Sequence, residues 1–133
     1  MTYLFLFARI LYGGFFLMKG YRHFTKRQMY TQSAASKKVP APAVAVLGTG
    51  ILLVLGGLSV LLGVFPQIGM WLIVAYLVGT TPMMHNFWSV SDPNQKAVEM
   101  AQFLKNVGLL GATLMMIVFT YYLALPWPFR MVQ

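Results

Sequence analysis

The sequence predicts an all-α integral membrane protein, a four-helix bundle that forms one transmembrane domain over residues 1–133. Four long apolar stretches fill most of the chain, and the charged residues fall between these stretches or near the ends. Hydrophobic residues make up 59% of the chain and charged residues 9%, against about 45–50% and about 25% in soluble domains. A soluble fold could not bury so much apolar surface.

The first helix is expected at residues 3–20, since crossing a bilayer takes about 20 apolar residues. The N-terminal segment shows neither a basic leading region nor a small-residue cleavage site, so we expect this helix to be retained. A strongly basic stretch follows, up to Arg27. From there to Pro42 we expect a surface loop or a short interfacial helix, because Pro40 and Pro42 disfavour helix just ahead of the next span.

The second helix, at residues 43–65, carries no charge and ends at a tight connection around Pro66. A connection this short makes the second and third helices antiparallel neighbours. The third helix, at residues 68–88, contains Pro82. Because proline removes a backbone hydrogen bond, we expect a bend near Thr80.

The fourth helix, at residues 93–125, has the clearest start signal. Asp92 fits the N-cap position, Pro93 the first helical position, and Gln95 the capping-box position three residues after the cap. This helix is longer than the bilayer requires, so its first turns should stand outside the hydrocarbon. Pro126 should stop it at the other end.

Small residues spaced four apart recur in the later helices. In lipid, helix association depends on close van der Waals packing, which such residues allow. We therefore expect them to serve the packing of the bundle rather than a conduction path. The pairs are Ala45 and Thr49, Ser59 and Gly63, Ala75 and Gly79, and Gly108 and Ala112.

The distribution of positive charge predicts the orientation. With four spans, both termini lie on one side of the membrane, and the basic segment and the Asp92 loop lie on the other. That second side receives eight of the ten Lys and Arg residues, whereas Arg9 and Arg130 remain for the first. The positive-inside rule then places both termini outside the cytoplasm of a multi-pass protein in the bacterial cytoplasmic (inner) membrane.

The same charge pattern bears on partners. A net charge of +8 would suggest nucleic acid in a polar protein, but here the charges follow the loops of a membrane topology, so we expect no nucleic acid partner. The chain has no cysteine, which excludes disulfides and thiolate metal sites within it. We expect no metal site.

Arg9 is a candidate partner contact, because an arginine inside a membrane span is costly and marks a functional site. The two acids, Asp92 and Glu99, belong to the opposite interface and cannot easily neutralise it. Two alternatives remain open. Arg9 either reaches lipid phosphates or backbone carbonyls, or it meets an acidic residue of another subunit or an anionic ligand.

His23 and His85 close the first and third helices at the basic interface, and Lys105 and Asn106 begin the membrane part of the fourth. A short loop should bring the ends of the third and fourth helices to one depth. These four residues are therefore candidates for binding a quinone or a lipid head group. Haem or a chlorophyll-type pigment is disfavoured, and ordinary interfacial hydrogen bonding is the remaining alternative. No catalytic residue is evident.

Short motifs occur in a fixed order between about residues 5 and 120. They are Arg9 with Gly13, Phe16 and Gly20; Pro40, Ala41 and Pro42; Gly56 and Gly57 with Gly63; His85, Asn86, Phe87 and Trp88; and Phe103, Leu104, Lys105 and Asn106. In this order they resemble the DoxX family (DoxX/DoxD-like) of small four-helix membrane proteins. The chain has Leu53 where many members carry a glutamate, and this substitution removes the obvious internal partner for Arg9.

The resemblance implies a membrane anchor or a quinone-side component, similar to the membrane subunit of a thiosulfate:quinone oxidoreductase or to members that act beside soluble redox partners. We therefore expect an accessory subunit that docks in a larger redox or bioenergetic membrane complex, with other membrane-protein subunits and lipids as partners. It is not expected to be an enzyme by itself or to hold an intrinsic cofactor. The alternative is a quinone-binding membrane subunit of an oxidoreductase.

Overall fold

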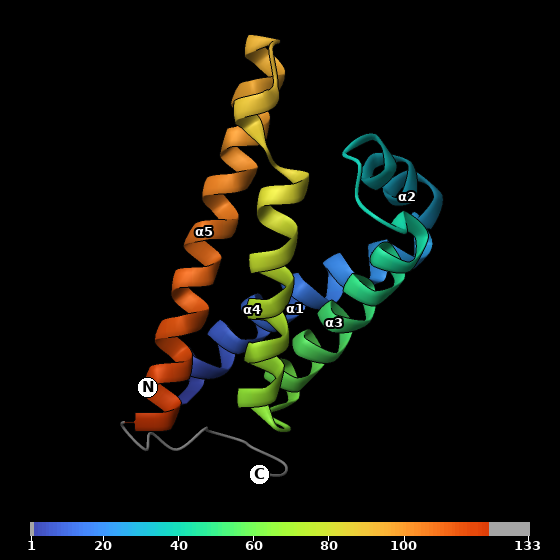
Figure 1. Cartoon of the computed structure of the whole chain (residues 1–133). Coiled ribbons are helices and arrows are strands. Elements are labelled where there is room, and N and C mark those ends of the chain that lie inside the picture. The colour runs from blue at the N-terminus through green and yellow to red at the C-terminus, as the bar shows by residue number, and fades with distance from the viewer. Residues whose placement is uncertain (1, 123–133) are drawn as a thin grey trace.

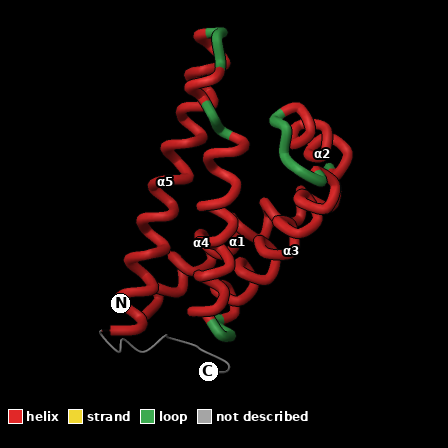
Figure 2. The backbone as a smooth tube through the Cα atoms, viewed as in Figure 1, coloured by secondary structure: helices red, strands yellow, loops and turns green. Residues whose placement is uncertain are grey.

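The structure, a computed structural model, describes residues 2–122, and within this range it consists of helices joined by short turns (Figures 1 and 2). The elements are α1 (Thr2–Thr25), α2 (Arg27–Ser36), α3 (Pro42–Leu62), α4 (Pro66–Met84), the 3₁₀ helix η1 (Phe87–Ser89) and α5 (Pro93–Tyr122). The residues expected to end the last helix, up to Leu125 and Pro126, lie outside the described range, as does Arg130.

Four of these helices, α1, α3, α4 and α5, are long and apolar enough to cross a membrane. Large apolar side chains such as Tyr3 and Val44 are exposed on them, 82% and 70%, as lipid-facing positions require. The protein is therefore a multi-pass, all-α membrane protein, as the sequence predicts. Helix α1 begins and α5 ends at the same end of the bundle (Figure 1).

The end of the first helix differs from the expectation, because α1 does not end at Gly20 but continues to Thr25. The following segment forms a short helix, α2, which is one of the two expected alternatives. Gly20 lies within α1 and faces α3, where an added Cβ would lie 2.9 Å from the Cβ of Leu53. Ala34, 3% exposed, buries one face of α2.

The turn between α3 and α4 confirms the tight connection. Gly63 caps α3 in the left-handed conformation at φ 71°, and the backbone N–H groups of Gly63 and Val64 donate to the carbonyl of Ser59, at 2.9 and 3.1 Å. This pattern satisfies carbonyls that a helix end leaves unpaired. Pro66 then begins α4, so the two helices run antiparallel (Figure 1).

The predicted start of the last helix is also confirmed. The Asp92 carboxylate accepts a hydrogen bond from the backbone N–H of Gln95 at 2.9 Å, and α5, with 30 residues, is the longest described helix. Helix α4 continues through Pro82 and ends at Met84. The bend near Thr80 remains a prediction.

Glycines set the closest helix contacts. An added Cβ at Gly57 of α3 would lie 2.6 Å from the backbone nitrogen of Leu17, and one at Gly13 of α1 would lie 2.9 Å from the carbonyl oxygen of Gly57. The two backbones therefore nearly touch, as small residues permit in membranes. By contrast, Gly79 and Gly108 have open space at the Cβ position, so these two members of the small-residue pairs do not serve close packing.

The most extensive helix contacts join α1 to α3, α3 to α4, and α4 to α5. The α1–α3 pair and the α4–α5 pair lie close together at the end that holds the α3–α4 turn and diverge toward α2 and η1 (Figure 1). The core where they converge contains Phe16, Leu53, Met70 and Ile73, each fully buried. A hydrogen bond between the hydroxyl groups of Tyr12 and Thr113 ties α1 to α5. The divergence opens a space at the basic end.

Candidate functional site

A cavity of about 540 Å³ lies between the two helix pairs at the basic end. Its volume falls in the range of small-molecule sites, about 300–1,000 Å³. Every α-helix contributes to its lining. The polar lining residues are Lys19, Arg22 and His23 of α1, Tyr30 of α2, Thr49 of α3, Tyr76 and Thr80 of α4, His85 at the end of α4, and Gln102 and Lys105 of α5.

Positive charge dominates this cavity. The basic residues Lys19, Arg22 and Lys105 line it, and no Asp or Glu is among its lining residues. Most of the remaining lining is apolar, including Met18, Leu52 and Met83. The cavity thus combines a cationic lining with apolar walls inside the membrane-spanning helices.

Lys19 is held against aromatic rings. Its Nζ lies 5.2 Å from the ring centroid of Tyr76 on α4 and 5.8 Å from that of Phe15, one turn earlier on α1. Both distances fit a cation–π interaction. Both rings also line the cavity, so these contacts keep the ammonium group at its wall.

His23 is buried and connects three helices. Its Nδ1 lies 3.1 Å from both the Val46 carbonyl oxygen and the Thr49 hydroxyl oxygen of α3, and its ring stacks on Tyr30 of α2 at 4.8 Å. A carbonyl oxygen only accepts hydrogen bonds, so Nδ1 must carry the hydrogen and donate to the Val46 carbonyl. In the neutral ring, Nε2 is then an acceptor. This histidine fixes α2 over the cavity.

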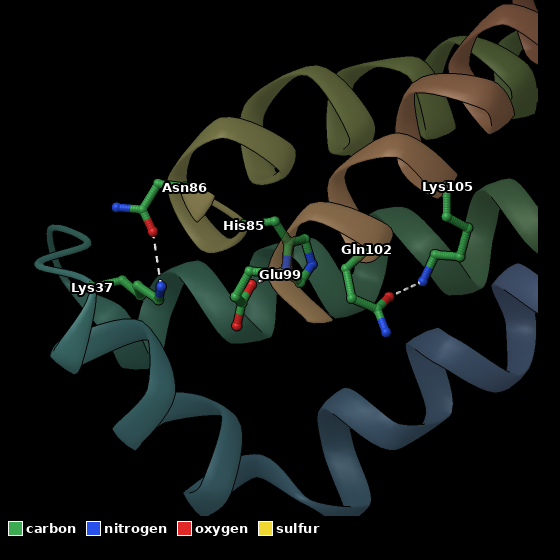
Figure 3. A network of polar contacts seen from close by, with 6 residues as sticks. All are labelled: Lys37, His85, Asn86, Glu99, Gln102 and Lys105. Atoms are coloured by element: carbon green, nitrogen blue, oxygen red, sulfur yellow. Dashed lines mark hydrogen bonds and ion pairs between the residues drawn. The ribbon is translucent and has the colours of Figure 1, made fainter. Parts of the chain in front are cut away.

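Three further polar contacts lie at the basic end of the bundle (Figure 3). His85 lies 2.8 Å from the carboxylate of Glu99, and the ammonium group of Lys37 donates to the Asn86 side-chain oxygen at 2.8 Å. On α5, Lys105 donates to the side-chain oxygen of Gln102. The first contact joins α4 to α5, and the second joins the end of α2 to the start of η1.

The structure brings together three of the four predicted head-group residues, because His23, His85 and Lys105 all line the cavity. Asn106 does not line it. Its side chain is fully buried, and neither its nitrogen nor its oxygen has a hydrogen-bond partner among the described residues. Adjacent helical residues point about 100° apart, so Lys105 and Asn106 face different surroundings.

Arg9 lies outside the cavity, 3% exposed. Its Nε donates to the carbonyl oxygen of Val60 at 3.1 Å, and one terminal nitrogen donates to that of Leu61 at 2.8 Å. The structure thus agrees with the first alternative for Arg9, in which its side chain bonds backbone carbonyls. Its role as a partner contact remains a proposal.

Sequence reasoning missed Lys19, Tyr76 and Glu99 as parts of this region. Lys19 precedes His23 by one helical turn on the same face, and this spacing could have indicated it. Tyr76 sits within an apolar run and gives no such signal. Within residues 2–122, no cluster of three His, Cys, Asp or Glu side chains could hold a metal ion.

Comparison with known protein families matches residues 4–86, more than half of the chain, to DoxX. The chain belongs to the DoxX family. No curated protein and no solved structure matches it. The matched stretch of this DoxX protein runs from α1 to the end of α4 and includes His23 and His85, whereas the motif of Phe103 to Asn106 lies beyond it.

Proposed function

We propose that this DoxX protein is an accessory subunit of a membrane-bound redox complex, which docks with other membrane subunits and holds an amphiphilic molecule for them without catalysing a reaction itself. The observation that carries this proposal is the cavity, whose cationic and hydrogen-bonding groups sit among apolar walls. A molecule with a polar head and an apolar chain matches both parts. Membership of the DoxX family supports the link to membrane oxidoreductases.

The apolar walls favour a ligand that enters from the lipid. Met18 of α1 and Met83 of α4 line the cavity and are 52% and 43% exposed. Gly79 also lines it and has open space where a side chain would stand. A chain could therefore leave the cavity sideways and remain in the bilayer.

A quinone-binding subunit of an oxidoreductase is the second candidate. His85 and Lys105 both line the cavity and carry N–H donors that could bond quinone carbonyls. In this alternative, a partner subunit would supply the electrons, and this chain would only position the ring.

The test is native mass spectrometry of the complex extracted in mild detergent, with lipid extraction of the same sample. We expect partner subunits and a stoichiometric amphiphile. The variant Gly79→Leu should fill the cavity and reduce the amphiphile severalfold while leaving the subunits assembled. Gly48→Leu is the matched control, because Gly48 on α3 has equally open space but does not line the cavity. A chain that copurifies with neither partner nor amphiphile would refute the proposal.

A further inference from the structure

We infer that the amphiphile is an acid, whose phosphate or carboxylate head group binds among Lys19, Arg22 and Lys105. This inference rests on the proposed function, because it names the chemical class of the molecule in the same cavity. Three observations support it: the balance of charge in the lining, the contacts of Lys19, and the arrangement of Lys105.

The charge balance is the strongest observation. Three basic residues line one cavity, and no Asp or Glu is among its lining residues, so like charges gather there without an acid to offset them. The nearest partner of the Glu99 carboxylate is His85 at 2.8 Å, and the contact involves none of these three cations. An anionic head group would supply the missing charge, and basic pockets between helices at the cytoplasmic side of membranes bind such head groups.

The contacts of Lys19 leave it open to a ligand. Its Nζ faces the rings of Phe15 and Tyr76, and no hydrogen bond or ion pair of this group occurs within residues 2–122. A cation–π contact holds the ammonium group through the charge of the ring face, whereas a phosphate or carboxylate would accept charge-assisted hydrogen bonds from its N–H groups. The rings therefore position the ammonium group without saturating its three donors.

Lys105 is arranged in a similar way from the opposite side. It donates one hydrogen bond to the side-chain oxygen of Gln102, which leaves two N–H donors on its ammonium group and the amide N–H groups of Gln102. Both residues line the cavity. The α1 and α5 helices thus offer donors to one head group from two sides.

A neutral quinone fits these observations less well than an acid. It could accept hydrogen bonds from Lys105 or His85, but it would leave the charges of all three cations without compensation. The two candidates therefore differ in one measurable property, the dependence of binding on the charge of the head group.

The experiment uses the full chain purified in neutral detergent and titrated with four probes. Phosphatidylglycerol and phosphatidylcholine with identical acyl chains differ in net charge, inorganic phosphate tests the anion alone, and ubiquinone tests the neutral ring. Bound lipid is counted by native mass spectrometry, and thermal stabilisation is measured in parallel. We expect phosphatidylglycerol to bind at least about tenfold more tightly than phosphatidylcholine or ubiquinone, as a charge-assisted contact requires, and inorganic phosphate to give no stabilisation.

The variants separate the cavity from general surface charge. Lys19→Gln should weaken phosphatidylglycerol binding about tenfold. Lys96→Gln, which removes the same charge from an exposed position outside the cavity, should leave binding unchanged. Arg22→Gln serves as a second cavity variant. Because Arg22 is exposed, its replacement should leave the protein folded even if Lys19→Gln does not.

Equal affinity for the two phospholipids, preferential binding of ubiquinone, stabilisation by inorganic phosphate alone, or an equal loss in Lys96→Gln would each overturn the inference. The proposed function would survive the first two results if Gly79→Leu still displaced the bound molecule. It would fail separately if no amphiphile occupied the cavity in the extracted complex.

Discussion

Arg9 of α1 donates from its Nε to the carbonyl oxygen of Val60 at 3.1 Å and thereby caps the C-terminal end of α3. Helix α3 ends at Leu62, so the carbonyls of Val60 and Leu61 belong to the last four, which have no partner within the helix. The guanidinium group also places positive charge at the negative end of the helix dipole. A charge inside the membrane is thus matched to polar groups of its own chain.

We predict that Arg9→Leu destabilises the isolated protein by about 1–3 kcal/mol, because it leaves two carbonyls without their charged donor. Arg9→Lys should recover part of the loss, since an ammonium group cannot reproduce the fork of the guanidinium. Unfolding in detergent, followed by circular dichroism, measures both. Wild-type stability of Arg9→Leu would show that the bonds to Val60 and Leu61 contribute nothing and that Arg9 is kept for lipid or for a partner.

The sequence was sufficient to predict the four spans because the thickness of the bilayer fixes the length of an apolar helix. It was insufficient for the end of the first helix, which continues past Gly20 to Thr25. The missing side chain of Gly20 lets α3 approach, and this contact between helices leaves no signal in the sequence. Likewise, α2 has a polar composition with no span-like signal, and its place over the cavity depends on the stacking of Tyr30 on His23.

Part of the site was predictable from the length of one connection. Helix ends joined by a short connection must lie at one depth, so His85 and Lys105 were expected close together, and both line the cavity. The rotation of each helix about its axis follows from packing, which the sequence alone does not reveal. Asn106 was therefore expected beside Lys105 but is buried away from the cavity, and the contact of Glu99 with His85 was not foreseen.

We predict that Gly57→Ala destabilises the protein by about 1–3 kcal/mol, the usual cost of overpacking. The new methyl group would lie 2.6 Å from the backbone nitrogen of Leu17 and must push α1 away from α3. Gly108→Ala is the matched control, because its Cβ position is empty and alanine favours the helix by about 0.5–1 kcal/mol. Thermal unfolding that ranks the two variants in the opposite order would contradict the observed α1–α3 packing.

The orientation in the membrane can be tested with single cysteines, since the natural chain has none. Ser36, the last residue of α2, and Tyr3, near the start of α1, are both exposed. Helix α2 and the start of α1 lie at opposite ends of the bundle (Figure 1), so Ser36→Cys and Tyr3→Cys report on the two sides. With both termini outside the cytoplasm, an impermeant maleimide should label Tyr3→Cys in intact cells and Ser36→Cys only after permeabilisation. The reverse pattern would invert the orientation that the positive-inside rule predicts.

The pair of His85 and Glu99 should couple α4 to α5. Its atoms lie 2.8 Å apart, and the two side chains are 21% and 19% exposed, so we predict a coupling energy of about 0.5–1.5 kcal/mol in a double-mutant cycle of His85→Ala and Glu99→Gln. A cycle of Glu99→Gln with Thr120→Ala, far along α5, should be additive within about 0.5 kcal/mol.

Because Glu99 precedes Gln102 by one helical turn, the contact between His85 and Glu99 would also fix the rotation of α5 that turns Gln102 and Lys105 toward the cavity. Additive effects of His85→Ala and Glu99→Gln would show that helix packing alone sets that rotation.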